Sequence, residues 1–486
     1  KLEQNYRSTQ NIVDAANSLI HKNERQIEKR VYSKKEPGSK IGLISLYSDY
    51  EEAYAVAAKI IEMRMNDRLN AYADFAILYR TNAQSRVLEE ALRKHAIPYR
   101  VYGGLSFYQR KEIKDILSYF RLVVNPHDEE ALKRVINYPI RGIGNTTITK
   151  LLDAATEYMV SPWTILCDPL TYALPVNAGT AAKLSSFKEM ILTFQEKNQT
   201  LSLEKLTDFI LKETGILSFL VQDQTVEGQS KFENAQELVK GIMEYCDMKK
   251  EEGEEQVRLT DFLSEVALLT DQDNDRNEQT DKVTLMTVHA AKGLEFKNVF
   301  IVGLEEDLFP SMMSKDNTRA LEEERRLFYV AITRAEENCV LTYAKSRFRN
   351  GKTMICLPSR FLRDIDSAYL DVPQDVFGLD TFSSERSSST FQKNTFLINE
   401  NKSVSFSNIP KQEPKLTKLS SATSTANAIA PLGGLTIGTR VGHMRFGEGE
   451  IIALEGEGGN AKATVCFEHS GVKQLLLKFA KLTVIE

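Results

Sequence analysis

The sequence lacks the features that mark secreted, zinc-binding or membrane-embedded proteins. Its five cysteines are scattered and never form a CxxC pair, which argues against a disulfide framework and against zinc sites. No apolar run approaches the ~18–20 residues of a membrane span, and no signal-peptide pattern opens the chain. We therefore expect a protein of the reducing cytoplasm.

The chain also lacks a net charge that would attract it to nucleic acid. Its formal net charge is −5, so any such binding depends on a local basic surface. At 486 residues and 42% hydrophobic composition, it is long enough for several cores, or about two to four domains. Because the chain begins at Lys1 and runs at once into the motif-like KLEQNYRST, we expect a fragment of a longer protein.

A phosphate-binding loop is missing as well. The stretch NGKT (350–353) ends like GxxxxGK[ST], but Ser346 stands where the first glycine is required and no helical pattern follows. Asn350-Gly351 is instead typical of a tight hairpin turn. We expect a hairpin here and no nucleotide cradle of the chain's own.

Two separate parts of the chain carry the pattern of a parallel α/β sheet. Strands are expected at 40–47, 74–80 and 98–103, and again at 283–289, 298–304 and 339–345. A strand–helix–strand unit builds parallel sheet through a right-handed crossover. The simplest account is one α/β domain, residues 1–107 and 281–370, with an all-helical domain at 108–280 inserted into it.

The last part of the chain changes character twice. Residues 371–433 are rich in Ser, Thr, Asn and Pro, and too few apolar residues remain to offset the entropy of ordering, so we expect a flexible linker. Short strand patterns return at 434–486 and predict a small β-barrel.

Three polar blocks lie beside the predicted strands: QNYRST (4–9), VHAAKGLEF (288–296) and EEERRLFYVAITRAEE (322–337). The last places Arg334 at the end of an apolar helix, where its permanent charge needs an anion or a carboxylate. Ligands of parallel sheets bind at the carboxyl edge of the strands, so we expect the blocks to meet there and form half of a site. The alternative is that each arginine pairs with a glutamate of its own domain.

In this order, and separated by helices, the blocks resemble motifs IV, V and VI of the UvrD/Rep/PcrA-type DNA helicases of superfamily one, most of all the PcrA type. The resemblance covers essentially the whole chain. It implies a RecA-like domain 2A interrupted by a helical domain 2B and followed by a linker and a Tudor-like or SH3-like barrel. It also implies ATP and Mg²⁺ as cofactors, with the phosphate loop and the magnesium ligands in an amino-terminal RecA-like half, so that this chain alone is expected to be inactive.

The resemblance further implies roles around the nucleotide. Arg7 and Arg334 match the arginines that reach the γ-phosphate, where phosphoryl transfer needs compensating positive charge. Tyr6 matches the aromatic that stacks on adenine, while Gly293 and Glu295 belong to the block that meets the nucleotide. Local alternatives stay open: Tyr6 as a cap over the next helix, and Glu295 as the partner of a neighbouring lysine.

The same resemblance implies contacts with DNA. Thr287, His289 and Lys292 match the loop on the single-stranded DNA track, and Phe348 is a candidate for base stacking. A packing role is the alternative for His289 and for Phe348.

Within the helical insertion, PIRGIGNTTITKLL (139–152) resembles the GIG element that touches duplex DNA. Its glycines and the following helix start would present backbone N–H groups to a phosphate. A common turn is the alternative. The residues concerned are Arg141, Gly142, Gly144 and Thr146.

The terminal barrel resembles modules that engage RNA polymerase, through a pattern that contains His443, Phe446 and Gly447. Tight turns account for the glycines equally well. Taken together, the sequence predicts the carboxyl-terminal half of a 3′–5′ helicase acting on single-stranded and duplex DNA. A non-catalytic module that binds DNA and RNA polymerase is the alternative. A helicase-nuclease is disfavoured, because residues 371–486 show a linker and a barrel instead of clustered metal ligands.

Overall fold

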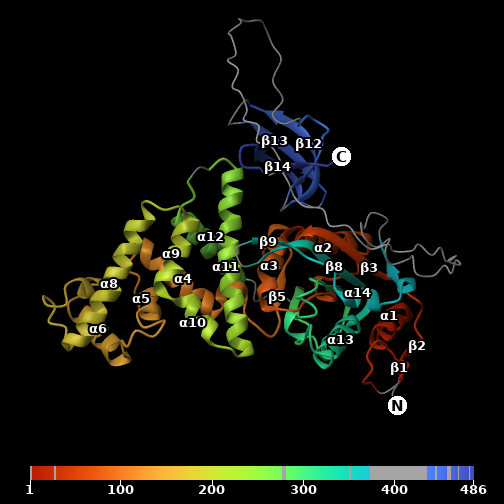
Figure 1. Ribbon diagram of the computed structural model, residues 1–486, viewed down its shortest axis with the longest axis horizontal. Helices are drawn as coiled ribbons and strands as arrows, with labels where there is room; N and C mark the ends of the chain where they lie inside the picture. Colours follow the sequence, from red (N-terminus) through yellow and green to blue (C-terminus); the bar gives the residue numbers. More distant parts are fainter. Residues whose placement is uncertain are drawn as a thin grey trace, which may run out of the picture. The chain divides into compact units, whose positions relative to one another are not determined.

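The computed structural model describes residues 3–26, 29–254, 256–275, 281–349, 352–372, 435–443, 446–456, 461–468, 470–480 and 482–485. The predicted linker, residues 371–433, therefore lies almost entirely outside the described residues. We call residues 3–104 together with 281–372 the sheet region, residues 107–275 the helical region, and residues 435–485 the C-terminal sheet (Figure 1).

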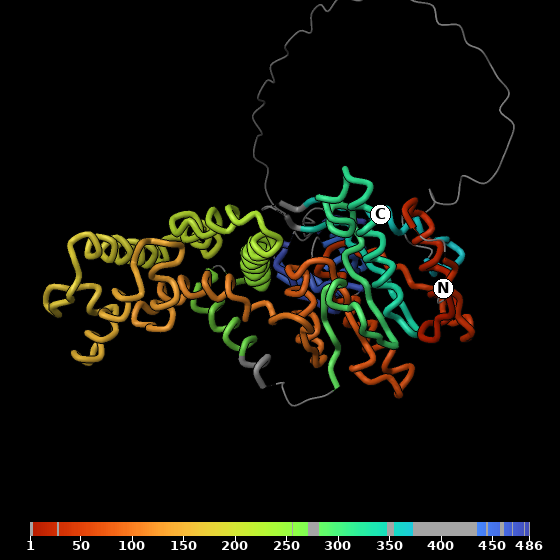
Figure 2. Tube along the Cα trace, turned by 90° about the horizontal axis from the view of Figure 1, so that it is seen from below, coloured from red at the N-terminus to blue at the C-terminus, as the bar shows by residue number. Residues whose placement is uncertain are grey.

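An eight-stranded sheet is the centre of the sheet region, and it combines both parts of the sequence. Its strand order is β10-β3-β8-β7-β4-β6-β5, with β9 beside β8. All neighbours are parallel except β8 and β9. Strand β4 lies between β6 and β7, so chain segments about 200 residues apart pair directly, as the shared position of the red-orange and green-cyan traces shows (Figure 2). The strands are β3 (Ile41–Ser48), β4 (Phe75–Tyr79), β5 (Tyr99–Val101), β6 (Val283–Thr287), β7 (Phe296–Ile301), β8 (Ala335–Arg349), β9 (Lys352–Ile355) and β10 (Leu370–Asp371).

The parallel sheet and the inserted helices are confirmed, and so is the hairpin. Arg349 of β8 pairs with Lys352 of β9 in antiparallel register, so the strands on either side form a hairpin and NGKT is not part of a phosphate loop. The predicted turn residues, Asn350 and Gly351, lie outside the described residues. Two short parallel strands, β1 (Gln4–Asn5) and β2 (Tyr32–Ser33), were not expected.

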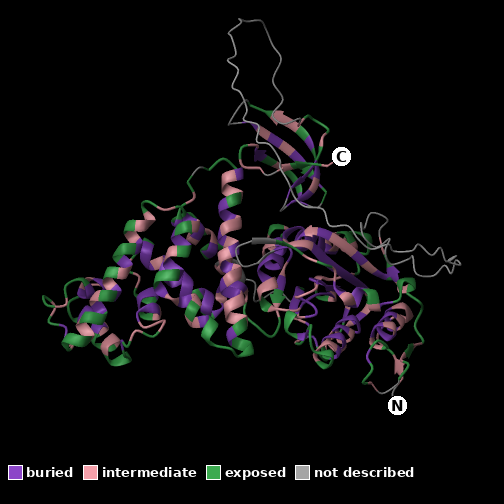
Figure 3. Cartoon of the chain, in the orientation of Figure 1, coloured by how far each residue is buried: buried purple, intermediate pink, exposed green. Residues whose placement is uncertain are grey.

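Helices cover the sheet in two packed groups. Helix α2 packs beside α3 and against β3 and β8, while α1 packs with α13 and α14. The apolar stripes read from the sequence are the buried sides of these helices (Figure 3). Their bounds are α1 (Gln10–Ile20), α2 (Asp49–Asn66), α3 (Ser85–Lys94), α13 (Thr318–Ile332) and α14 (Arg360–Asp364).

The helical region has a hydrophobic core of its own, formed by buried residues between Phe107 and Val266. Helix follows helix through this region, as the sequence pattern predicts for an all-helical insertion. The helices are α4 (Lys111–Val124), α5 (Glu129–Val135), α6 (Asn145–Glu157), α7 (Pro162–Cys167), α8 (Ala178–Asn198), α9 (Leu203–Thr214), α10 (Ile216–Gln222), α11 (Val226–Glu251) and α12 (Leu259–Asp275).

Buried ion pairs join the helical region to the sheet region, and each region supplies one of the cations. Lys240 of α11 pairs with Asp49 at the start of α2. Arg86 of α3 pairs in the opposite sense, with Glu237 at 2.8 Å and Glu244 at 2.6 Å, both on α11. Because a buried carboxylate without a cation is costly, this reciprocal pairing favours the observed packing of α11 against α2 and α3.

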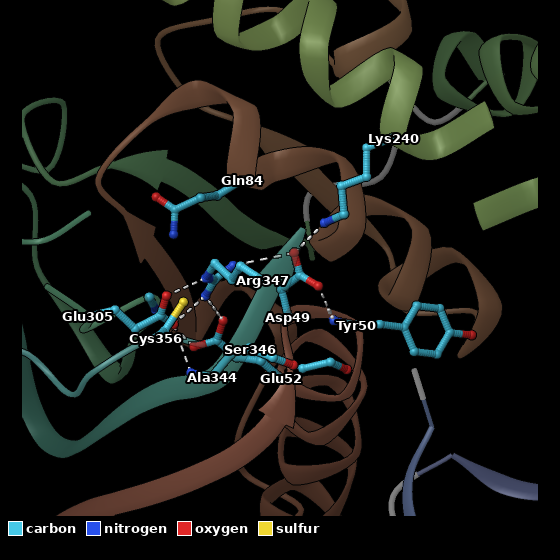
Figure 4. Close-up of polar contacts among 12 residues, drawn as sticks. Asp49, Tyr50, Glu52, Gln84, Lys240, Glu305, Ala344, Ser346, Arg347 and Cys356 are labelled. Atoms are coloured by element: carbon cyan, nitrogen blue, oxygen red, sulfur yellow. Dashed lines mark hydrogen bonds and ion pairs between the residues drawn. The ribbon is translucent and has the colours of Figure 1, made fainter. Parts of the chain in front are cut away.

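Next to Asp49, the sheet region contains a second buried arginine. Arg347 of β8 donates to Glu52 of α2 and, at 2.6 and 2.8 Å, to Glu305, while its Nη1 lies 3.7 Å from Asp49 (Figure 4). Burial alone would raise the pKa of Asp49, but Lys240 and Arg347 hold it below its ordinary value. One cation of the sheet region thus faces three carboxylates, and Lys240 supplies the second positive charge.

The C-terminal sheet confirms the predicted run of short strands. It is five-stranded and antiparallel, in the order β14-β13-β12-β11-β15, and it buries Val441, Ile451, Val465 and Phe467. The strands are β11 (Arg440–His443), β12 (Gly447–Glu455), β13 (Lys462–Phe467), β14 (Gly471–Leu476) and β15 (Leu482–Val484). Among the described residues, no helix is both long enough and apolar enough to span a lipid bilayer.

Candidate functional site

The three polar blocks do meet, in a cluster of two arginines and one carboxylate. Arg7, in the turn before α1, forms an ion pair with Glu295. Its Nη1 also donates to the backbone oxygen of Thr333 at 3.2 Å. Arg334 follows Thr333 at the end of α13 and donates to the backbone oxygen of Leu294 at 3.0 Å. Residues from the start, the middle and the end of the sheet region therefore share one site.

The cluster does not lie at the edge of the sheet that the sequence suggested. Glu295 immediately precedes β7 and Arg334 immediately precedes β8, so both residues lie at the amino edge of these parallel strands. The expectation of a carboxyl-edge site was wrong for the arginines. The reason is position along the chain: Glu295 and Arg334 come before their strands, whereas the carboxyl-edge rule concerns residues that follow a strand. Strand β8 also starts at Ala335, four positions earlier than its apolar pattern indicates.

Arg334 is held by uncharged acceptors. Its Nε donates to the backbone oxygen of Val330 at 3.0 Å and its Nη2 to Oγ1 of Thr333 at 3.2 Å, in addition to the bond from Nη1 to Leu294. Burial and the neighbouring Arg7 cation lower the pKa of Arg334, and Glu295 opposes them. A guanidinium whose charged form is disfavoured in this way gains when an anion binds beside it.

The two arginines therefore differ in whether they pair with a glutamate of their own domain. Arg7 pairs with Glu295 of its own domain, as the local alternative supposed, whereas the described contacts of Arg334 are with backbone oxygens and a hydroxyl. Lys297 pairs with Asp74 instead of Glu295. The cluster contains two positive charges and one negative charge, which leaves it attractive to a phosphate.

Tyr6 and Gly293 flank this cluster. The side chain of Tyr6 is 76% exposed, so it is available for stacking and does not pack as a cap over α1. Gly293 is exposed and has φ +94°, with no atom within 4 Å of the position that a Cβ would take. Its backbone conformation, more than a close neighbour, favours glycine.

A connection of eight residues, 288–295, crosses from one edge of the sheet to the other. It leaves β6 at the carboxyl edge and enters β7 at the amino edge, with β4 between the two strands. The backbone N–H of Ala291 donates to the backbone oxygen of Thr287, the last residue of β6, and the N–H of Leu294 donates to the backbone oxygen of Ala291. The block thus reaches from the predicted DNA residues at its start to the arginine cluster at its end.

Of the predicted single-stranded DNA residues, Thr287 and His289 lie at or next to the carboxyl end of β6, and Lys292 lies midway along the connection to β7. Thr287 accepts a bond from the backbone of Ala290 at 3.2 Å, and His289 and Lys292 are exposed. Partial burial and the nearby Arg80 cation lower the pKa of His289. Phe348 belongs to β8, and its side chain lies outside the described residues. His289 and Lys292 are accessible to a ligand, and the role of these residues in binding DNA stays a prediction.

In the helical region, the GIG loop has its charge turned inward. The Arg141 guanidinium donates to the backbone oxygens of Val135 and Tyr138 at 3.0 and 2.9 Å, and to the Tyr119 hydroxyl at 2.7 Å. These bonds account for Arg141 as a support of the loop, and its role in binding DNA stays a prediction. Gly142, Gly144 and Thr146 are exposed, and α6 begins directly after Gly144.

The predicted partner residues of the C-terminal sheet are buried. The ring of His443 stacks on Phe446 with centroids 4.6 Å apart, and Phe446 packs on Phe467 at 5.2 Å. Gly447 is buried and has φ +80°, a backbone conformation that favours glycine at this position. As arranged, these residues stabilise the fold of the sheet, and a role in binding RNA polymerase stays a prediction.

Sequence reasoning missed Thr333 and Arg80. Arg80, at the end of β4, binds Glu324 of α13 through bonds of 2.7 and 3.1 Å, and it faces His289 closely enough to affect its pKa. The signal was available for Arg80, because it follows a predicted strand at its carboxyl end. In the described part of the chain, no three His, Cys, Asp or Glu side chains gather as a metal site would require.

This combination of a parallel sheet, an inserted helical region, a cross-block arginine cluster and a separate C-terminal sheet defines the class of protein. Residues 1–346 match the family model described as UvrD-like helicase C-terminal domain, and residues 437–483 match the PcrA/UvrD tudor domain. The chain belongs to the UvrD-like helicase C-terminal domain family.

Similar curated proteins carry helicase names. The chain is 36% identical to the ATP-dependent DNA helicase PcrA of Leuconostoc citreum, over 100% of the chain and 63% of the relative. It is 37% identical to DNA helicase II of Escherichia coli K12, over 99% of the chain and 61% of the relative. It is 36% identical to the ATP-dependent DNA helicase PcrA of Bacillus subtilis 168, over 99% of the chain and 62% of the relative. The chain thus spans about three-fifths of the length of these relatives.

Proposed function

We propose that this chain is the carboxyl-terminal half of an ATP-dependent DNA helicase that moves 3′ to 5′ along single-stranded DNA and separates the duplex ahead of it, in DNA repair and replication in the cytoplasm. The observation that carries the proposal is the cluster in which Arg7 pairs with Glu295 while Arg334, held by backbone oxygens and a hydroxyl, adds a second positive charge. Phosphoryl transfer requires positive charge of this kind on the transferred group. The helicase names of the relatives support the same reading.

ATP and Mg²⁺ are the implied cofactors, and the residues present fit part of an ATP site. Arg7 and Arg334 would hold the phosphates, Tyr6 would stack on the base, and Gly293 and Glu295 would adjoin the nucleotide. Bound ATP supplies the free energy of phosphoryl transfer. Because the arginine cluster has excess positive charge and no metal-binding cluster occurs among the described residues, the Mg²⁺ ligands are expected in an amino-terminal RecA-like half.

The DNA contacts divide between two regions. Thr287, His289 and Lys292 would meet single-stranded DNA at the carboxyl edge of the sheet, with Phe348 on the neighbouring hairpin. Backbone N–H groups at Gly144 and at the start of α6 would meet duplex phosphates. The C-terminal sheet would recruit RNA polymerase. The proposed phosphate contacts would position DNA without reading its sequence.

DNA-stimulated ATP hydrolysis tests the proposal. The chain is assayed alone, with an amino-terminal RecA-like half added, and with that half plus Arg334→Ala. We expect no turnover by the chain alone, turnover in the mixture, and a loss of about 10³-fold or more in the variant. Intact DNA binding without turnover in any mixture would favour the non-catalytic binding module.

A further inference from the structure

We propose that Thr333 is a positioning residue that fixes where both arginine guanidiniums of the cluster stand. The inference rests on the proposed function, since the positions matter only if the arginines face a phosphate. Thr333 contacts Arg7 and Arg334 through two different groups, its backbone oxygen and its side-chain hydroxyl. Thr333 therefore forms hydrogen bonds with both guanidinium groups.

The hydroxyl of Thr333 takes part in two hydrogen bonds. It accepts from Nη2 of Arg334 at 3.2 Å and donates to the backbone oxygen of Val330 at 3.0 Å. Val330 also accepts from Nε of Arg334 at 3.0 Å. The guanidinium, the hydroxyl and the last turn of α13 therefore form a closed ring of bonds, which restricts rotation of the Arg334 side chain.

The backbone of Thr333 adds the link to the first cation. Its carbonyl oxygen accepts from Nη1 of Arg7 at 3.2 Å, while its own N–H donates to the backbone oxygen of Tyr329 at 3.1 Å. The side chain is 7% exposed, so water cannot readily replace the hydroxyl. One buried residue at the end of a helix thus contacts both guanidiniums, beside the ion pair of Arg7 with Glu295 and the bonds of Arg334 to Val330 and Leu294.

A fixed arginine matters for rate more than for affinity. Misplacement by about 1 Å of a group that acts in the transition state can cost on the order of 10²-fold. Three of the roughly five N–H donors of a guanidinium are used by Arg334 to fix its position. The remaining donors can then face an anion without a further loss of side-chain entropy.

The test compares Thr333→Val, which has the same shape but no hydroxyl, with Thr333→Ser, which keeps the hydroxyl. Both are made in the complete helicase, in which an amino-terminal RecA-like half precedes this chain. We expect Thr333→Val to lower kcat of DNA-stimulated ATP hydrolysis at least about tenfold while KM for ATP changes less than about twofold. Thr333→Ser should restore kcat to within about threefold of the original.

Thr214 provides the matched control. It is also 7% exposed, and its hydroxyl donates to the backbone oxygen of Ile210 at 2.7 Å in α9, far in sequence from the cluster. Thr214→Val removes a comparable helical hydroxyl and should leave kcat unchanged. Should Thr333→Val fold poorly, Thr333→Ala removes the same hydroxyl without placing a second methyl group beside Val330.

The outcomes separate this inference from the proposed function. Activity that Arg334→Ala abolishes but Thr333→Val and Thr333→Ala leave intact would overturn the positioning role and keep the helicase. A loss in Thr333→Val that Thr333→Ser does not restore would also overturn it. An original protein without ATP hydrolysis, or one indifferent to Arg334→Ala, would count against the proposed function itself.

Discussion

Replacing Lys240 with methionine tests the reciprocal ion pairs between the helical and sheet regions. The side chain of Lys240 is 4% exposed, pairs with Asp49, and has Glu244 and Glu237 at 3.6 and 3.8 Å. Methionine keeps much of the buried chain but removes the charge. Asp49 would then depend on Arg347, which already binds Glu52 and Glu305. Breaking a buried pair in this way costs about 3–5 kcal/mol of unfolding free energy.

The effect of Lys240→Met on the unfolding free energy should depend on pH. With Lys240 present, the pKa of Asp49 lies below 3.8, so the contribution of the pair is present above that pH and is lost as pH falls through the folded-state pKa. Without Lys240, burial raises the pKa of Asp49. The destabilisation is then fully present at neutral pH, and it decreases as pH falls and Asp49 takes up a proton.

Urea unfolding of the chain at about pH 7.5 and about pH 5 measures both effects. Lys59→Met is the control, because Lys59 forms an exposed pair with Glu62 on α2 that is worth at most about 0.5 kcal/mol. Asp49→Asn combined with Lys240→Met should recover part of the loss. A Lys240→Met variant no less stable than Lys59→Met at pH 7.5 would refute the reasoning.

Two further substitutions test local packing: one in the GIG loop of the helical region and one just after β7 in the sheet region. Arg141→Met leaves acceptors of the GIG loop without a donor. We therefore expect urea unfolding to show a loss of about 3 kcal/mol in unfolding free energy. A loss no larger than that of Arg68→Met, which changes an exposed arginine, would contradict the role of Arg141 as a support of the loop. Gly303→Ala places a Cβ 2.3 Å from Gln84 Nε2 at φ +73° and should cost at least about 2 kcal/mol. Gly215→Ala, at φ +69° with nothing within 4 Å, should cost only the backbone strain of about 1 kcal/mol, and equal losses would rule out the steric argument.

Much of the fold was readable from the sequence because apolar periodicity reports directly on burial. The strand patterns at 40–47 and 74–80 correspond to β3 and β4, and the stripe around Val87 and Leu88 is the buried side of α3. Strand ends were less readable, because polar residues extend β8 to Ala335. The edge of the arginine cluster was wrong for a different reason: Glu295 and Arg334 precede β7 and β8, and residues that precede a parallel strand lie at its amino edge.

The candidate site was readable in its residues but not in its contacts. The blocks that contain Arg7, Glu295 and Arg334 do converge, whereas Arg141 resembles a phosphate contact in sequence and folds against carbonyl oxygens of its own loop. A sequence gives the charge of a guanidinium but not the direction in which it points. The contacts of Thr333 could not be predicted for the same reason, because the sequence does not show which groups its hydroxyl will bind.

The eight-residue connection 288–295 has a mechanical consequence. A segment that carries its own turn hydrogen bonds resists stretching more than a slack loop does, and this one is anchored in β6 at one end and β7 at the other. We therefore expect a displacement of Glu295 at one end of this connection to shift His289 near its other end.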